Sequence, residues 1–146
     1  MGKMILLSLC LAASAWTNPP VPALQPPTRL PAAHVRSQAQ CALLLDLKLP
    51  KGWKLDAHTP LRWRFTEIYA GFTFAKRKDQ LLSPRLPVHI PFKATTGATG
   101  ARLMVDFRYC RKASCVDGNA DYLVVIQADE KESRTEIPVT IQVTKN

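Results

Sequence analysis

Several patterns that would place this chain in a common class of enzymes are missing from its sequence. No stretch of ten residues carries the apolar stripe of an amphipathic helix. There is no Gly-rich phosphate loop, no serine nucleophile motif and no paired-carboxylate pattern. His34, His58 and His89 have no such motif beside them. These absences argue against a hydrolase or a nucleotide enzyme, and we expect no cofactor.

Long hydrophobic runs are also missing, so we expect no transmembrane span in the mature chain, since a span needs about 20 apolar residues. The N-terminus instead has Lys3, the apolar run Met4–Ala13 and the small-residue ending Ala13-Ser14-Ala15. This order predicts a secretory signal peptide over residues 1–15, cleaved after Ala15. Cys10 would leave with it. We therefore expect a periplasmic or secreted protein.

Acidic residues are scarce, with 11 Asp and Glu against 20 Lys and Arg, which gives a formal net charge of +9. The charge falls to +8 once Lys3 leaves with the signal. The middle third of the chain holds much of the excess: Arg62, Arg64, Lys76, Arg77, Lys78, Arg85 and Lys93. Such a surface could bind nucleic acid, acidic polysaccharide or an anionic membrane surface, or it could steer an acidic partner protein. For Lys76, Arg77 and Lys78 we favour a solvated loop between strands. Export argues against nucleic acid as the ligand.

Proline is abundant where apolar periodicity is absent. Six of the twelve prolines lie between Asn18 and Pro31. This composition predicts an extended, disordered tether over residues 16–40. The remaining residues, 41–146, are long enough for one domain with a core.

Within residues 41–146 the apolar residues recur with period two, which predicts half-buried strands. The alternating runs begin near Leu43, Leu61, Leu103, Tyr122 and Ile137. Short strands without helices predict an all-β fold, an immunoglobulin-like antiparallel β-sandwich, with an open barrel as the alternative.

The run Leu86–Phe92 alternates in the same way but contains Pro87 and Pro91. Both missing N–H donors face the same side. The run is therefore predicted to be a strand at a sheet edge or at a bulge.

The stretch Tyr109–Val116 holds Cys110 and Cys115, which export would allow to form a disulfide. So short a ring contributes only roughly 2 kcal/mol by the loop-length relation. Arg108, Arg111 and Lys112 surround the sulfurs with positive charge, which favours thiolate and hence thiol–disulfide exchange. A structural bridge at a strand end is the other interpretation, and the spacing favours neither.

Cys41 is the third cysteine of the mature chain and begins an apolar alternating run. We predict a Cys110–Cys115 bridge, because these two sulfurs are close in sequence, and a buried, free thiol at Cys41. A zinc site formed by the three cysteines with His58 or His89 has little support, since no second close pair of ligands follows. We therefore expect no metal.

Four further segments occur in a fixed order along the chain: Leu47–Leu55, Arg85–Val88, the strand Leu103–Tyr109 running into Cys110, and Ile137–Val139. Together they resemble the N-terminal periplasmic domain of the thiol:disulfide interchange protein DsbD and related domains at the C-terminus of some NHL-repeat proteins. The resemblance implies an immunoglobulin-like sandwich that passes electrons through Cys110 and Cys115. Its donor would be a separate thioredoxin-like or membrane redox protein, and its acceptors exported proteins. It also implies that Cys115 carries the mixed disulfide and that Cys110 resolves it.

The chain departs from the DsbD pattern around the cysteines. DsbD has five residues between them, a glycine before the first and an aromatic residue and a proline after the second. Here there are four, flanked by Tyr109 and Val116. In DsbD an acidic-aromatic loop caps the pair. By position the resemblance implies that residues 67–72 form this cap, with Tyr69 or Phe72 as its lid.

Overall fold

The computed structural model describes residues 26–144 and contains eleven strands and no helix over that range. The strands are β1 (Thr28–Arg29), β2 (Ala33–Arg36), β3 (Cys41–Lys48), β4 (Lys54–Leu55), β5 (Leu61–Thr66), β6 (Phe72–Thr73), β7 (Lys78–Leu81), β8 (Val88–Ala94), β9 (Gly97–Arg111), β10 (Ser114–Asp129) and β11 (Glu136–Gln142). The all-β class is confirmed. No helix in this part of the chain is long and apolar enough to cross a membrane.

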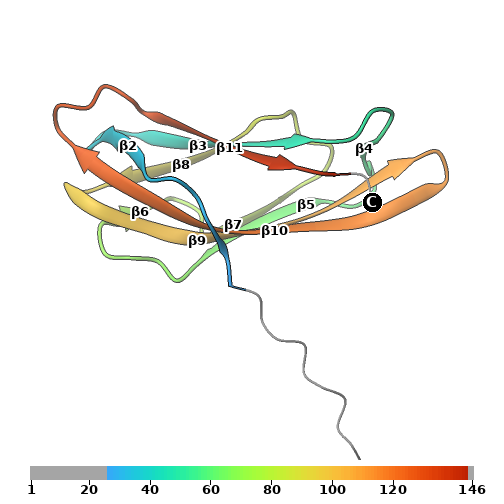
Figure 1. Ribbon diagram of the computed structural model, residues 1–146, viewed down its shortest axis with the longest axis horizontal. Coiled ribbons are helices and arrows are strands. Elements are labelled where there is room, and N and C mark those ends of the chain that lie inside the picture. Colours follow the sequence, from blue (N-terminus) through green and yellow to red (C-terminus); the bar gives the residue numbers. More distant parts are fainter. Residues whose placement is uncertain (1–25, 145–146) are drawn as a thin grey trace, which may run out of the picture.

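The strands form two sheets that lie over one another, as expected for a β-sandwich (Figure 1). The larger has the order β1-β10-β9-β5-β7, with β2 also on β10 and β4 also on β9. The smaller has the order β11-β3-β8-β6. The hairpin of β9 and β10 runs the length of the molecule, and its tip lies at one end (Figure 1).

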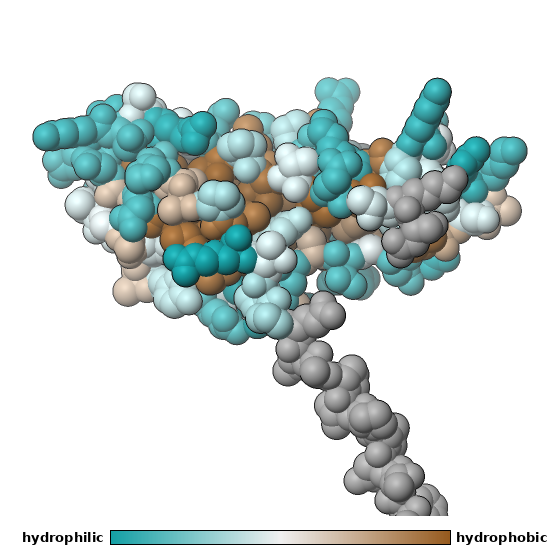
Figure 2. Space-filling view, in the orientation of Figure 1, coloured by the Kyte–Doolittle hydropathy of each residue, from teal (hydrophilic) through white to brown (hydrophobic). Residues whose placement is uncertain are grey.

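The core lies between the sheets and comes from alternate residues of the strands. In β3, for example, Leu43, Leu45 and Leu47 are buried while Lys48 is exposed. Apolar residues gather in a band along the middle of the molecule, with hydrophilic residues around it (Figure 2). The runs predicted from period two correspond to β3, β5, β9, β10 and β11. The pattern holds because burying one face of each strand removes apolar surface from water.

The antiparallel arrangement expected of the sandwich holds for most strand pairs of the described residues but not for all. β11 pairs with β3 in parallel, and β1 and β2 both pair with β10 in parallel. Period two shows which residues share a face of a strand, but it does not encode the direction of the neighbouring strand.

The predicted edge strand corresponds to β8. Residues 88–92 pair with β3 on one side, and on the other side the described residues cover only Lys93 and Ala94, through β6. Ala42 donates its N–H to Thr135 on the β11 side of β3 (2.9 Å), so Ala42 and its partner Pro91 exchange no hydrogen bond. The nitrogen of Pro91 therefore faces the open edge, where a strand tolerates proline.

The predicted tether is wrong for its second half. Within residues 26–40, β1 and β2 pair with β10, and Val35 is fully buried. The backbone N–H groups of Arg36, the last residue of β2, and of Ser37 and Gln38 after it donate to the carbonyls of Arg134, Asp129 and Ala94. A single buried side chain between exposed ones is too short a pattern for a periodicity argument to detect. The predicted signal peptide and residues 16–25 lie outside the described residues.

Candidate functional site

Cys110 and Cys115 are bridged, with 2.09 Å between the sulfurs, as the sequence predicted. They lie directly opposite each other near the tip of the β9–β10 hairpin. Arg111 pairs with Ser114, which leaves Lys112 and Ala113 as a two-residue turn. Lys112 takes a positive φ of 54°, as the first position of such a turn can require. The short Cα–Cα distance of 4.1 Å fits the closely spaced type of antiparallel pair, which carries no hydrogen bonds between its two residues.

The bridge lies on the outer face of the larger sheet. Phe107 and Tyr109 on β9 point toward the core side, so Arg108 and Cys110 point outward. Cys115 is exposed, whereas Cys110 is half-buried because β4 pairs with β9 beside it. Cys115 is therefore the residue that an incoming group meets first.

The cations named from the sequence differ in how they face the bridge. Arg108 shares the face of the sulfurs, but its guanidinium lies between two carboxylates, 3.7 Å from Asp56 and 3.8 Å from Asp117. The hydroxyl of Thr59 donates to Asp56 (2.7 Å) and, with the backbone N–H of His58, lowers the pKa of that carboxyl. The carboxylates offset the charge of Arg108.

Arg111 and Lys112 are both exposed at the tip. Arg111 follows Cys110 in the strand and so points to the opposite face. Its Nε would lie 3.7 Å from a Cβ placed on Gly52, so the side chain packs over the turn before β4. Lys112 lies in the turn itself, between the two strands that carry the sulfurs.

Sequence reasoning missed Lys54. Lys54 lies opposite Cys110 in the β4–β9 pairing, so Lys54, Cys110 and Cys115 form a row across three strands on one face. No described carboxylate forms an ion pair with Lys54. The pairing of β4 with β9 places Lys54 beside Cys110, and no local sequence pattern predicts that pairing. We take Lys54, Lys112, Cys110 and Cys115 together as the bridge site.

The lid implied by the DsbD resemblance is wrong for this chain. Tyr69 donates its backbone N–H to Gly100 (2.9 Å), near the start of β9. Cys110 lies about ten residues further along that strand, or about 33 Å away. Phe72 is 4% exposed and packs in an aromatic cluster with Phe65 and Phe92. Both residues thus lie far from the bridge.

Trp53 and Tyr109 are the aromatic residues near the bridge. Their ring centroids are 5.2 Å apart in an edge-to-face arrangement. Trp53 immediately precedes β4 and Tyr109 immediately precedes Cys110. The pair therefore anchors β4 against β9 and fixes the position of Lys54.

Cys41 is free and 2% exposed, as predicted for an inert thiol. It lies on β3, in the smaller sheet, and its Sγ is 3.7 Å from the carbonyl of Arg36. Burial raises its pKa. Within residues 26–144 no group of three His, Cys, Asp or Glu could hold a metal ion.

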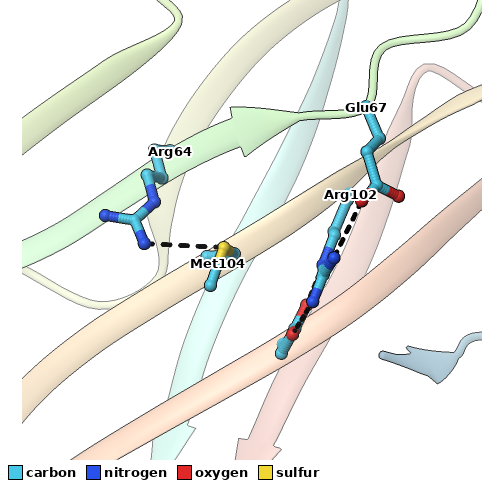
Figure 3. Close-up of polar contacts among 5 residues, drawn as sticks. Arg64, Glu67, Arg102 and Met104 are labelled. Atoms are coloured by element: carbon cyan, nitrogen blue, oxygen red, sulfur yellow. Dashed lines mark hydrogen bonds and ion pairs between the residues drawn. The ribbon is translucent and has the colours of Figure 1, made fainter. Parts of the chain in front are cut away.

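Some of the basic residues from the middle third of the chain line a shallow hollow of about 480 Å³ on the outer face of the larger sheet. Arg62, Arg64 and Lys78 contribute cations, and Asp79 and Asp106 contribute carboxylates. Arg64 lies 3.6 Å from Met104 Sδ (Figure 3). The hollow has mixed charge.

Beside the hollow, Arg102 holds Asp121 with two hydrogen bonds, of 2.8 and 2.6 Å, and Glu67 with a third of 2.8 Å (Figure 3). The guanidinium of Arg102 lowers the pKa of Asp121. This network fastens β9, β10 and the end of β5 to one another, a structural task.

Comparison of the chain with protein-family models and with curated proteins finds no match to either.

Proposed function

We propose that this protein is an exported thiol:disulfide exchange protein that works through Cys110 and Cys115. The observation that carries the proposal is the exposed cross-strand disulfide with the unpaired cation Lys54 in the same row. The resemblance to DsbD implies that the two sheets have an immunoglobulin-like arrangement, and it also implies a direction of electron transfer. By that resemblance, electrons pass from a thioredoxin-like or membrane redox protein to exported substrates.

The exchange has two balanced halves. A donor thiolate attacks Cys115 Sγ, the Cys110–Cys115 bond breaks, and Cys110 leaves as a thiolate beside Lys54. A second donor thiolate then attacks the mixed disulfide, which releases the reduced protein and the oxidised donor. Cys115 next attacks a substrate disulfide, and Cys110 resolves that mixed disulfide and restores the bridge. Two electrons reach the substrate in each cycle.

A non-catalytic binding domain with a structural bridge is the second candidate. The position of the bridge next to a two-residue turn favours it, since cross-strand bridges also fasten hairpins. The distance of Tyr69 and Phe72 from the bridge favours it too, because no DsbD-like lid covers the sulfurs from those positions. The hollow of mixed charge lined by Arg62, Arg64 and Lys78 would then be the natural place for a partner.

Reduction potential separates the two candidates. Structural disulfides have potentials below about −300 mV and exchange-active ones lie above that value. We expect the Cys110–Cys115 couple to equilibrate with glutathione or thioredoxin buffers above about −300 mV. A value in the structural range would favour the binding domain.

Trapping of mixed disulfides tests the roles of the two cysteines. The Cys110→Ala variant is first converted at Cys115 to its mixed disulfide with thionitrobenzoate. It should then trap a covalent complex with a thioredoxin-like protein that lacks its own resolving cysteine, because the single thiolate of that protein displaces thionitrobenzoate. The matched Cys115→Ala variant should trap much less, because Cys110 is half-buried beside β4. Bands on a non-reducing gel give the count, and Cys41→Ser in both variants removes the remaining thiol. Equal trapping would contradict the assignment, and no trapping together with a low potential would refute exchange.

A further inference from the structure

The outer edge of β10 is open beside the bridge. β1 pairs with Tyr122 and Leu123, and β2 pairs with residues 126–129. No described residue pairs with residues 114–121 on that side. The open length therefore begins at the disulfide and ends where β1 begins.

The backbone groups on this edge can be assigned from the hydrogen bonds farther along β10. The carbonyl of Leu123 accepts from Leu30 N–H (3.0 Å), and the carbonyl of Asp129 accepts from Ser37 N–H (3.1 Å). In an antiparallel strand the outward groups belong to alternate residues. By the same alternation Cys115, Asp117 and Asn119 direct their N–H and C=O groups to the open edge. Cys115 thus presents both a sulfur and an unpaired peptide group.

Pro26 breaks the hydrogen-bond ladder of β1 along this edge. In a parallel pair the bonding N–H groups come from alternate residues, so the series that contains Leu30 continues with Thr28 and then residue 26. Residue 26 is Pro26, which has no N–H to donate to Asn119. Pro26 therefore interrupts the ladder beyond Thr28, and no described residue pairs with the outward backbone groups of residues 115–119.

We infer that this edge docks an extended segment of the redox partner, which adds as a strand and places its own cysteine opposite Cys115. The inference rests on the exchange function proposed above. Adjacent strands lie about 4.7–4.9 Å apart and disulfides span Cα–Cα distances of about 4.4–6.8 Å, so an opposed cysteine is within bonding reach. Backbone pairing would orient the segment without reading its sequence.

The negative charge of Asp117 on this edge indicates which partner segments would fit best. Asp117 shares the face of Cys115, and its side chain is 82% exposed. A Lys or Arg two residues from the partner's cysteine would lie opposite Asp117. The preferred occupant is thus an extended segment with a cysteine and a cation on one face.

A covalently tethered peptide tests docking without relying on catalysis. A nine-residue peptide of alternating Val and Thr, with a central Cys and a Lys two residues away, is joined by a disulfide to Cys115 of the Cys110→Ala variant, so that it is long enough to reach Asn119. Hydrogen exchange should then show slower exchange of the Asp117 and Asn119 amides, by about tenfold or more, than in the same variant carrying glutathione. Unchanged exchange at both amides, or protection at β7 or β8 instead, would overturn the inference.

Kinetics separate a failure of docking from a failure of the proposed function. The reduced protein attacks the peptide or glutathione, each supplied as its disulfide with thionitrobenzoate, and the released coloured thiolate gives the rate. Asn119→Pro removes an outward N–H and should lower the ratio of peptide rate to glutathione rate about tenfold. Asn119→Ala keeps the N–H and should leave the ratio near that of the parent. An unchanged ratio in Asn119→Pro refutes edge docking, whereas slow reaction with both reagents refutes exchange.

A second copy of the chain could also add to this edge. Sedimentation of the oxidised parent and of Asn119→Pro distinguishes that case. If the parent is a dimer and Asn119→Pro is a monomer, the edge serves self-association. That result would overturn the inference that a partner segment docks there.

Discussion

Lys54 and Arg111 show that side-chain direction, and not closeness in sequence, decides which cation acts on the bridge. Arg111 is the immediate neighbour of Cys110 but points to the opposite face and packs over Gly52. Lys54 is far away in sequence and lies directly across from Cys110. Arg108 faces the bridge, but Asp56 and Asp117 offset its charge. In the proposed exchange, Lys54 is therefore the cation on a neighbouring strand that is placed to stabilise a thiolate at Cys110.

Replacing Lys54 with Gln should slow exchange with glutathione about two- to fivefold, because a less stabilised thiolate leaves more slowly. Raising the ionic strength should shrink the difference, since both groups are close to solvent. Arg111→Gln is the matched control and should change the rate less. Stopped-flow rates at low and high salt measure both variants. A larger effect in Arg111→Gln than in Lys54→Gln would contradict the assignment.

At the scale of elements, the edges of the smaller sheet each contain a proline whose nitrogen faces outward. On β8 this residue is Pro91. On β11 it is Pro138, because Val143 donates its N–H to Lys48 on β3 (3.0 Å) and residues of the other parity face away. Edges without a full row of donors resist pairing with other chains. The edge beside Cys115 has no proline within residues 114–121.

Replacing Pro138 with Val restores an N–H on the outer edge of β11 and should increase self-association at high concentration. Sedimentation equilibrium measures the average mass against that of the parent chain. The double variant Pro138→Val/Thr140→Pro moves the missing donor two residues along the same edge and should return the mass to the parental value. Equal masses for all three proteins would show that proline does not protect this edge.

Single strands were predictable from the sequence, but their neighbours were not. The alternation of Leu43, Leu45 and Leu47 predicted β3, and the proline spacing predicted β8 as an edge strand. The parallel pairing of β11 with β3 could not be predicted, because side-chain periodicity is the same for either strand direction. The same distinction between local pattern and strand pairing applies to the candidate site. The bridge follows from local spacing, whereas Lys54 reaches it only through pairing between distant strands.

At the scale of the whole molecule, residues 33–38 join the two sheets. β2 pairs with β10 in the larger sheet, and Val35 is fully buried in the core. Directly after β2, Gln38 donates its N–H to Ala94 on β8 in the smaller sheet (2.9 Å). The folded unit therefore extends to the N-terminal side of Cys41.

A chain that begins at Cys41 should be less stable than one that begins at Pro26, by about 3 kcal/mol or more. The lost stability comes from the burial of Val35, the pairing of β2 with β10, and the backbone hydrogen bonds that Arg36, Ser37 and Gln38 donate. Urea unfolding of the two oxidised chains measures the difference. Limited proteolysis should agree with a large difference by leaving Val35 within the protected fragment. Equal unfolding midpoints would instead show that residues 26–40 behave as a tether.

The length of the central hairpin has a consequence for the shape of any partner. β9 has 15 residues and so extends about 50 Å, whereas β3, with 8 residues, extends about 27 Å. The hairpin tip thus reaches beyond the strands of the smaller sheet, with β4 beside it (Figure 1). Val116, just past the bridge, is 42% exposed. The disulfide is carried on a three-stranded projection of β4, β9 and β10 at one end of the molecule. It can therefore enter a recess that would exclude the whole sandwich, and a partner with a sunken reactive thiol is within its reach.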